Sequence, residues 1–412
     1  MARKELAQSK AKEYQRATKK RKGQILDNLC ENTGWSRDNA RRQLKKALIA
    51  KPPIKKGKLK KKRPLKYSLR SRQILMNAWA LSGTTCGQYL VVQIKDGLLG
   101  RLVKHGELKD GPKNKGEVVS AEDPALEEVL TMSSATIDRY LREEKKKLEP
   151  LSRSTTKKSS YPLRNEIPFG KSYTAVKTPG YLSTDTVAHC GASLKGEHLW
   201  TLNSTDVLTG WSETVTIKNH ARRWVIEGHD IILGDFPYKI LGINYDGGGE
   251  FINYEMLNYS RLQDYQMTRS RPYHSNDNAH VEQKNYDIVR KYAFRYRYEG
   301  KEALELLNQL WYWVNLRKNY LVPTKKCISH AKTRSGRTRG VYDKPKTPYL
   351  RTVASGILTE KDAGRLKGIY DNLNDAHVTR KINELQQRLL AIITDEELAE
   401  FINSKVDDAL AA

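Results

Sequence analysis

A series of strand-like and helix-like segments beginning at Tyr181 constrains the fold of this chain more than any other feature. Three short segments come first, each rich in β-branched or aromatic residues and separated by glycine-containing turns. They predict an antiparallel meander of three strands, over 181–190, 196–210 and 211–217. The segments that follow predict a helix over 219–233, a strand over 238–246, a helix over 251–264, a strand over 265–270 and a long helix over 276–296. The chain is therefore expected to contain an α/β core with a mixed five-stranded sheet and flanking helices.

This order of elements is that of the ribonuclease-H-like fold, in which three points of the core converge. Here those points carry carboxylates: Asp185 in the middle of the first strand, Asp246 at the end of the fourth strand, and Glu282 on the last core helix. Mg²⁺ and Mn²⁺ are hard cations that prefer anionic oxygen ligands, and two of them about 4 Å apart can act together on a phosphodiester. The three carboxylates are thus candidates for catalysis and for holding two Mg²⁺ or Mn²⁺ ions.

Several stretches resemble the DDE transposases and retroviral-type integrases, in the bacterial insertion-sequence branch with N-terminal helix-turn-helix domains. They are STDTVAHCG, TLNSTDVLTGWSE, YDGGGEF, TRSRPYHSNDNAHVEQKN and VYDKPKTPYLR. The resemblance runs through nearly the whole chain. It matches Asp185, Asp246 and Glu282 to the family's metal-binding residues, with 35 residues between the last two. It implies a DNA transposase or integrase that cleaves at element ends and transfers the freed 3′-hydroxyl into target DNA.

The sequence departs from the family pattern directly after the second aspartate. Gly247–Gly249 stands where the family commonly has asparagine and serine, so a more mobile loop is expected. Two alternatives stay open: a ribonuclease-H-like nuclease that cuts without joining, and a catalytically inert DNA-binding regulator. Taken singly, each carboxylate also fits a solvated or ion-paired residue, but spacing and element order together favour a site. Asp206, Asp235 and Glu250 are left outside it.

Four further residues are candidates for substrate binding. Asn285 and Arg290 follow Glu282 on the same predicted helix, where they could contact a metal-bound water or a DNA phosphate. His274 and Asn276 lie in the loop that leads into this helix. The alternative for these two is that they are ordinary turn residues.

The charge balance indicates a polyanionic partner. Lys and Arg number 74 against 47 Asp and Glu, which gives a formal net charge of +27. Charge alone does not separate DNA from RNA, but the predicted reading helices favour DNA, with element ends and target DNA as the partners. Because two ends must be held together for insertion, a homodimer or a higher oligomer on DNA is expected.

Residues 1–50 predict a helix-turn-helix DNA-binding domain. The turn at 33–36 offers Gly34 for a positive φ and Ser36 as the N-cap of the next helix. Apolar positions at helical spacing are Ile25, Leu26 and Leu29 before the turn and Ala40, Leu44 and Leu48 after it. The second helix carries the candidate DNA-binding residues Arg37, Arg41 and Arg42. A plain helical hairpin with a solvated basic face is the alternative.

The rest of the chain divides by composition. Residues 51–72 contain no acidic residue and predict a basic linker, and 73–150 predict a second helical DNA-binding domain. Its helix-turn-helix would use Ser133 as a cap and Arg139 and Arg142 as DNA-binding residues. A short hairpin packing on its neighbours is the alternative. Residues 151–178 predict a linker, 179–300 the catalytic core, and 301–412 a mostly helical, basic C-terminal region.

Neither membrane insertion nor export is indicated. No apolar run approaches the roughly 20 residues that a span needs, and the first residues lack the apolar stretch of a signal peptide. A cytoplasmic, nucleoid-associated protein is expected. The four cysteines form no C-x-x-C pair, so we expect buried or half-buried thiols rather than disulfides or a zinc knuckle.

Overall fold

The computed structural model describes residues 2–49, 66–111, 116–146, 167, 176–191, 193–245, 250–270, 284–332 and 338–393. They belong to two compact units, Met1–Lys66 and Tyr67–Ala412. The boundaries predicted at residues 150 and 300 fall inside the second unit. The helix α4 (Leu69–Leu81) begins before residue 72, where the predicted basic linker was to end.

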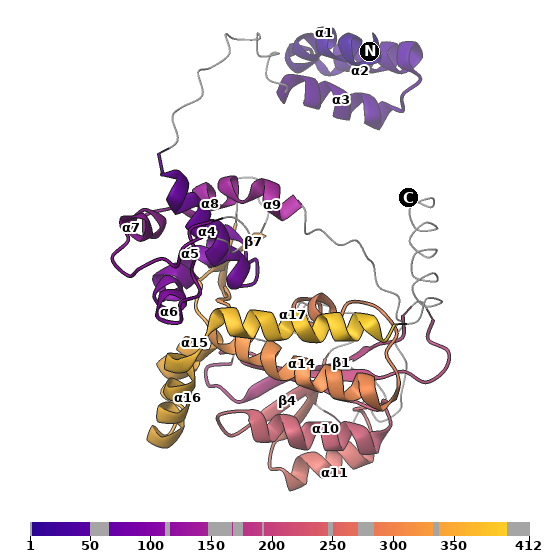
Figure 1. Ribbon diagram of the computed structural model, residues 1–412. Coiled ribbons are helices and arrows are strands. Elements are labelled where there is room, and N and C mark those ends of the chain that lie inside the picture. The colour runs from indigo at the N-terminus through magenta and orange to yellow at the C-terminus, as the bar shows by residue number, and fades with distance from the viewer. Residues whose placement is uncertain are drawn as a thin grey trace. The chain divides into compact units, whose positions relative to one another are not determined.

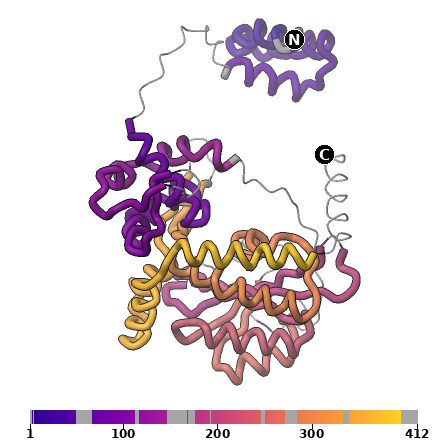
Figure 2. The backbone as a smooth tube through the Cα atoms, in the orientation of Figure 1, coloured from indigo at the N-terminus to yellow at the C-terminus, as the bar shows by residue number. Residues whose placement is uncertain are grey.

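The described residues of the first unit form three helices, α1 (Ala2–Arg16), α2 (Lys19–Thr33) and α3 (Arg37–Ile49) (Figures 1 and 2). The predicted turn between α2 and α3 is confirmed. Gly34 has a φ of 69°, and the Ser36 hydroxyl accepts a hydrogen bond from the Asn39 amide at 3.3 Å. Helix α1 lies before the two helices that flank this turn.

The core of this unit consists mostly of the predicted apolar positions. The buried residues are Ala11, Ile25, Leu26, Leu29, Ala40 and Leu44. Leu48 is an exception, because it lies in the last turn of α3 and is 37% exposed. Only two of the three apolar positions predicted on α3 therefore contribute to the core.

The second unit begins with a helical block around its own apolar cluster. Its helices are α4, α5 (Gly87–Lys95), α6 (Leu98–Lys104), α7 (Pro124–Leu130), α8 (Ser134–Tyr140) and α9 (Arg142–Lys146). Ser133 caps α8 as predicted, since its side chain accepts from the Thr136 amide. Ile137 and Leu141 are fully buried.

A five-stranded sheet forms the centre of the second unit. Its strands are β1 (Tyr181–Ala188), β2 (Trp200–Asp206), β3 (Ser212–Ile217), β4 (Gly242–Tyr245) and β5 (Gln266–Arg269). The strand order is β3-β2-β1-β4-β5. The first three strands pair antiparallel, whereas β4 pairs parallel with β1 and with β5. This arrangement fits the ribonuclease-H-like fold, and the predicted mixed five-stranded sheet is confirmed.

Helices cover both faces of the sheet, as Figure 1 shows. One side carries α10 (Arg222–Asp235) and α11 (Tyr254–Leu262), and the other carries α14 (Gly300–Tyr320) and α17 (Asp375–Ala391). Gly228 lets α10 approach β3 closely, because a Cβ there would lie 2.8 Å from Cγ2 of Ile217. The buried residues of α14 include Leu307, Leu310, Trp311 and Val314.

The C-terminal region is joined to the core rather than separate from it. Helix α14 packs on β3, and α17 packs on α14. Two further helices, α15 (Pro348–Ala354) and α16 (Glu360–Asn372), agree with the predicted helical character. The two-stranded sheet of β6 (Cys327–Lys332) and β7 (Thr338–Tyr342) was not predicted.

The long helix predicted over 276–296 is described only from Lys284 onward. Residues 285–290 form a π-helix, η5 (Asn285–Arg290), which continues as α13 (Lys291–Ala293). Single π-helical turns are rare, but those that occur often lie at functional sites. The part from 276 to 283 lies outside the described residues.

The structure also bears on the predictions for the cysteines and for membrane insertion. All four cysteines are free, but Cys86 is exposed rather than buried, since it stands at the N-cap of α5. Within the described ranges, none of the helices has the length and apolar character needed to cross a membrane.

Candidate active site

Asp185 lies in the middle of β1, with β2 on one side and β4 on the other. It is paired with Asn203 of β2 in the antiparallel register. Its neighbour Thr184 is paired with Tyr245, the last residue of β4. Asp185 is half-buried, so its carboxylate is close to the core without being sealed from solvent.

Hydrogen bonds from Thr186 and Asn285 help to orient the carboxylate of Asp185. Its Oδ1 accepts from the backbone amide of Thr186 at 2.8 Å. Its Oδ2 accepts from Nδ2 of Asn285 at 2.7 Å. The structure therefore brings together two of the predicted site residues, one from the central strand and one from the first position of the π-helix.

A third residue extends this contact into the sheet. Nδ2 of Asn203 donates to Oδ1 of Asn285 at 2.9 Å, and Oδ1 of Asn203 accepts from the Thr214 hydroxyl at 3.2 Å. Asn203 is fully buried and Thr214 is 6% exposed. The sequence analysis missed both residues. One signal was present for Asn203, because asparagine is depleted in strand interiors and this one stands in the middle of a strand.

Most of the remaining predicted site residues lie in parts of the chain that the structure does not describe. Asp246, Glu282, His274 and Asn276 lie outside the described residues. Arg290 ends the π-helix and is half-buried, and burial lowers the pKa of its guanidinium.

Two of the carboxylates that were left outside the site have structural contacts. Asp206 is buried and accepts hydrogen bonds from the backbone amides of Gly180 and Thr209, at 2.7 and 2.6 Å. It thereby fixes the turn that follows β2. Glu250 accepts from the Thr186 hydroxyl at 3.0 Å. Successive side chains of a strand point to opposite faces, so this contact is on the face opposite to Asp185.

Cationic side chains gather beside the turn that follows β2. Nζ of Lys284 lies 3.5 Å from the Gly210 carbonyl oxygen, and burial lowers the pKa of this lysine to about 8. The amine of Lys326 donates to the carbonyl of Val207, and burial lowers its pKa to about 7. Lys284 immediately precedes the π-helix, so positive charge lies close to the element that carries Asn285.

Asp287 of the π-helix also lies among cationic side chains. Asp287 pairs with Lys318 of α14. Burial alone would raise the pKa of Asp287, but the ammonium groups of Lys318 and Lys284 outweigh burial and lower it to about 2. The excess of cations here favours the approach of an anionic group.

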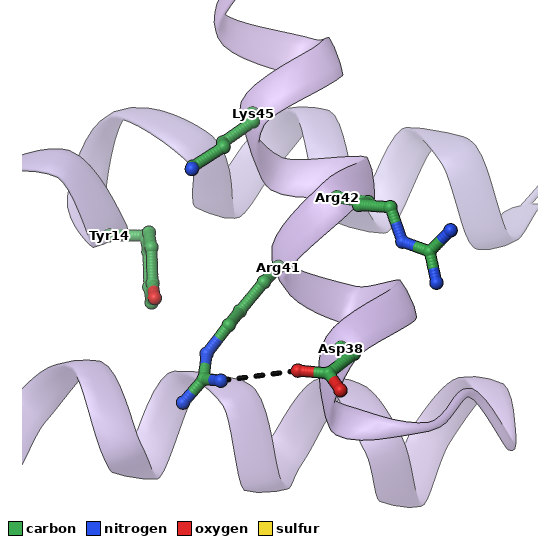
Figure 3. A pocket seen from close by; sticks show the side chains of 5 residues that line it. All are labelled: Tyr14, Asp38, Arg41, Arg42 and Lys45. Atoms are coloured by element: carbon green, nitrogen blue, oxygen red, sulfur yellow. Dashed lines mark hydrogen bonds and ion pairs between the residues drawn. The ribbon is translucent and has the colours of Figure 1, made fainter. Parts of the chain in front are cut away.

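Three of the candidate DNA-binding arginines lie on α3 and are exposed. Arg41 and Arg42 line a hollow of about 540 Å³ in the first unit, together with Tyr14, Asp38 and Lys45. In Figure 3, Arg41 and Lys45 extend toward the side of Tyr14, whereas Arg42 extends the other way. The pairing of Arg41 with Asp38 at 3.2 Å leaves Arg42 and Lys45 as the cations of the hollow with no ion pair among the described residues.

Arg37, Arg139 and Arg142 have different surroundings. Arg37 does not line the hollow and forms an ion pair with Asp27 of α2. Arg139 and Arg142 are exposed at α8 and α9, and Arg139 donates to the Thr136 hydroxyl at 3.2 Å. These positions are open to solvent, as a phosphate contact requires.

The carboxylate of Asp185 is a ligand type that hard divalent cations prefer. A carboxylate oxygen has two lone pairs, so it can accept one hydrogen bond and still bind a cation. Among the described residues there is no group of three or more His, Cys, Asp or Glu side chains that could hold a metal ion. Two of the three predicted ligands, Asp246 and Glu282, are outside that part of the chain.

The strand order and the half-buried aspartate on the central strand are those of a protein with a ribonuclease-H-like core. The chain belongs to the same family as the uncharacterized protein y4rM of Sinorhizobium fredii. The two are 32% identical over 351 residues, which cover 84% of this chain and 94% of that protein. No family model matches the sequence.

Two solved structures are similar to part of the chain at 16% sequence identity and a TM-score of 0.28. One is the catalytic core domain of BIV integrase, for which the match covers 43% of this chain and 95% of that one. The other is the HTLV-2 integrase catalytic core domain in complex with magnesium, in a dimeric form, for which the shares are 39% and 94%. At these values the fold assignment depends on the sheet topology described above.

Proposed function

We propose that the protein is a DNA transposase or integrase whose catalytic site is formed by Asp185, Asp246 and Glu282. The hydrogen bond between Asn285 and Asp185 carries the proposal, because it ties the central strand to the helical segment that begins three residues after Glu282. Consecutive Cα atoms are about 3.8 Å apart, so Glu282 is at most about 11 Å along the chain from Asn285.

The parallel register of β1 and β4 supports the second aspartate. Tyr245 is paired with Thr184, and Asp246 and Asp185 are the next residues of the two strands in the sequence. A strand that continued by one residue would bring these two carboxylates side by side. The proposed ligands thus come from two neighbouring strands and one helix.

The proposed site would hold two Mg²⁺ or Mn²⁺ ions through the three carboxylates. When bound, such ions activate a nucleophile and stabilise the charge of an in-line phosphoryl transfer. The residues of the chain would orient the reacting groups: Asn285 holds the Asp185 carboxylate, and the lysines near Gly210 attract the DNA backbone. The half-buried position of Asp185 limits the access of bulk water.

We assign binding of the element's ends to the first unit and to the helices α8 and α9. The three-helix unit presents Arg41, Arg42 and Lys45 around its hollow, with the Tyr14 ring beside them (Figure 3). Such a combination of cations with one aromatic ring suits a DNA backbone. Arg139 and Arg142 are proposed as a second contact. Joining two ends at one target calls for a dimer or a larger assembly on DNA.

A joining assay tests the proposal. The full chain is incubated with Mn²⁺, a plasmid target, and labelled DNA fragments taken from either side of the gene that encodes it. The expected result is a labelled product joined to the plasmid, which disappears when Asp185 is replaced by Asn. Labelled cleavage products without joining would point to a nuclease, and retardation of the fragments with neither reaction to a DNA-binding regulator.

A further inference from the structure

We infer that Asn203 is a positioning residue, which holds the Asn285 carboxamide with its NH₂ group toward Asp185 and so keeps the Asp185 carboxylate in one orientation. The inference rests on the proposed metal-binding role of Asp185. Asn203 is on β2, is fully buried, and is directly opposite Asp185 in the register.

The Asp185 carboxylate determines the direction of each hydrogen bond in the series that runs from it to Asn285, Asn203 and Thr214. An ionised carboxylate can only accept, so Asn285 must turn its nitrogen to Asp185 and its oxygen to Asn203. Asn203 must then turn its nitrogen to Asn285 and its oxygen to the hydroxyl of Thr214. All three contacts are 3.2 Å or shorter.

Without Asn203, only the Asp185 carboxylate would fix the orientation of Asn285, and Oδ1 of Asn285 would lose its donor. A carboxamide held at one end turns over more readily than one held at both ends. Turned over, Asn285 would present its oxygen to Asp185, and two acceptors would face each other. The carboxylate would then move away or bind a cation in a different geometry.

The sharpest test is Asn203→Asp, which keeps the size of the side chain. The introduced carboxylate only accepts, so it cannot donate to Asn285 Oδ1. The dissociation constant for Mn²⁺, measured by calorimetry on the full chain, should rise about 10- to 100-fold, the usual effect of losing a group that orients a metal ligand.

The same variant supplies a pH signature that a general loss of packing would not produce. Protonation of the introduced carboxyl restores an O–H donor toward Asn285, and burial raises its pKa. The ratio of variant to parent affinity should therefore recover as the pH falls from about 8 to about 6. Asn203→Leu removes donor and acceptor at similar volume, so it should show the loss without the recovery.

A second readout needs no metal. With ¹⁵N-labelled asparagine, the side-chain amide signals of Asn285 should shift in Asn203→Asp and return at lower pH. Asn219→Asp introduces the same charge in a loop before α10, where Asn219 Oδ1 accepts from the Ala221 amide at 2.9 Å. It should leave both the Mn²⁺ affinity and the Asn285 signals unchanged.

The results separate this inference from the proposed function. Parent-like Mn²⁺ binding by Asn203→Asp with unchanged Asn285 signals overturns the role of Asn203. If Asp185→Asn binds Mn²⁺ as the parent does, the metal role of Asp185 fails, whereas the amide signals still decide whether Asn203 orients Asn285.

Discussion

The carboxamide nitrogen of Asn285 lies 2.7 Å from a carboxylate oxygen of Asp185, although 100 positions separate the two residues in the sequence. This hydrogen bond links the central strand β1 to the π-helix η5. Any change that moves the helix is therefore expected to reach the carboxylate. Substitution of either Asp185 or Asn285 therefore tests the proposed reaction.

Replacing Asp185 with Asn should abolish the reaction while leaving the fold intact. The change removes an anionic oxygen and keeps the volume, so cleavage and joining should both fall on the order of 100-fold or more. Both activities are measured with labelled end DNA, and folding is followed by circular dichroism. Glu250→Gln is the matched comparison, because Glu250 contacts Thr186 on the other face of β1. Equal inactivation by Glu250→Gln would contradict the assigned ligand set.

Removing the cations of the hollow should weaken binding to DNA of any sequence. Arg42→Ala and Lys45→Ala should each reduce the slope of log affinity against log salt concentration by about 1, because each removes one phosphate contact. Fluorescence anisotropy over a salt series measures the slope. Arg21→Ala is the control, since Arg21 already pairs with Glu13 at 2.7 Å. An unchanged slope in both hollow variants would assign DNA binding elsewhere.

The buried carboxyl of Glu213 should make the protein less stable in alkaline solution. Its pKa is raised to about 8, mainly by burial, against about 4.3 in the unfolded chain. A raised folded-state pKa gives a contribution that is complete below the unfolded pKa and is lost as the pH rises through about 8. The free energy of unfolding should therefore decrease across this window.

Glu213→Gln tests this expectation. Glutamine resembles the protonated acid and can still accept from Trp211 Nε1, which donates to Glu213 at 2.7 Å. Urea unfolding at several pH values should give a flatter profile for the variant than for the parent. A variant that loses stability with rising pH as steeply as the parent would show that another group is responsible.

The ion pair between Arg101 of α6 and Asp375 of α17 should stabilise the second unit strongly. The two side chains lie 2.7 Å apart, with exposed fractions of 14% and 1%. Removing one partner leaves a buried charge, so Asp375→Ala should cost about 3–5 kcal/mol in urea unfolding. Arg365→Ala breaks an exposed pair with Asp362 and should cost less than about 1 kcal/mol. Equal losses for the two variants would show that burial of the Arg101 pair is unimportant.

The joining species should contain at least two copies of the chain, because two ends must be held at one target. Light scattering coupled to size-exclusion chromatography, on the protein with end DNA, gives the mass of the complex. A complex with one chain that still joins both ends to a plasmid would rule out this requirement.

Much of the core could be predicted from the sequence. The first three strands are separated by turns and the last two alternate with amphipathic helices, and these local patterns determine the element types. Local patterns do not determine the ends, and α4 accordingly begins before residue 72. Strands β6 and β7 were missed because β6 is mostly exposed and lacks an apolar face.

The candidate site was only partly accessible to the same reasoning. Asp185 and Asn285 were identified, but their hydrogen bond depends on how the helix crosses the sheet. Asn203 needed the register between β1 and β2, which pairs it with Asp185 and which no local pattern supplies. The direction of the hydrogen bonds that join Asp185, Asn285 and Asn203 follows only once the positions of these residues are known.

The pairing of Arg101 with Asp375 also has a consequence for synthesis. The two residues are 274 positions apart, so at about 5–20 residues per second a ribosome adds Asp375 roughly 14 to 55 seconds after Arg101. Once α14 (Gly300–Tyr320) has been added, the face that α17 later covers lacks that cover until α17 follows. A stop codon before residue 375 would make that condition permanent.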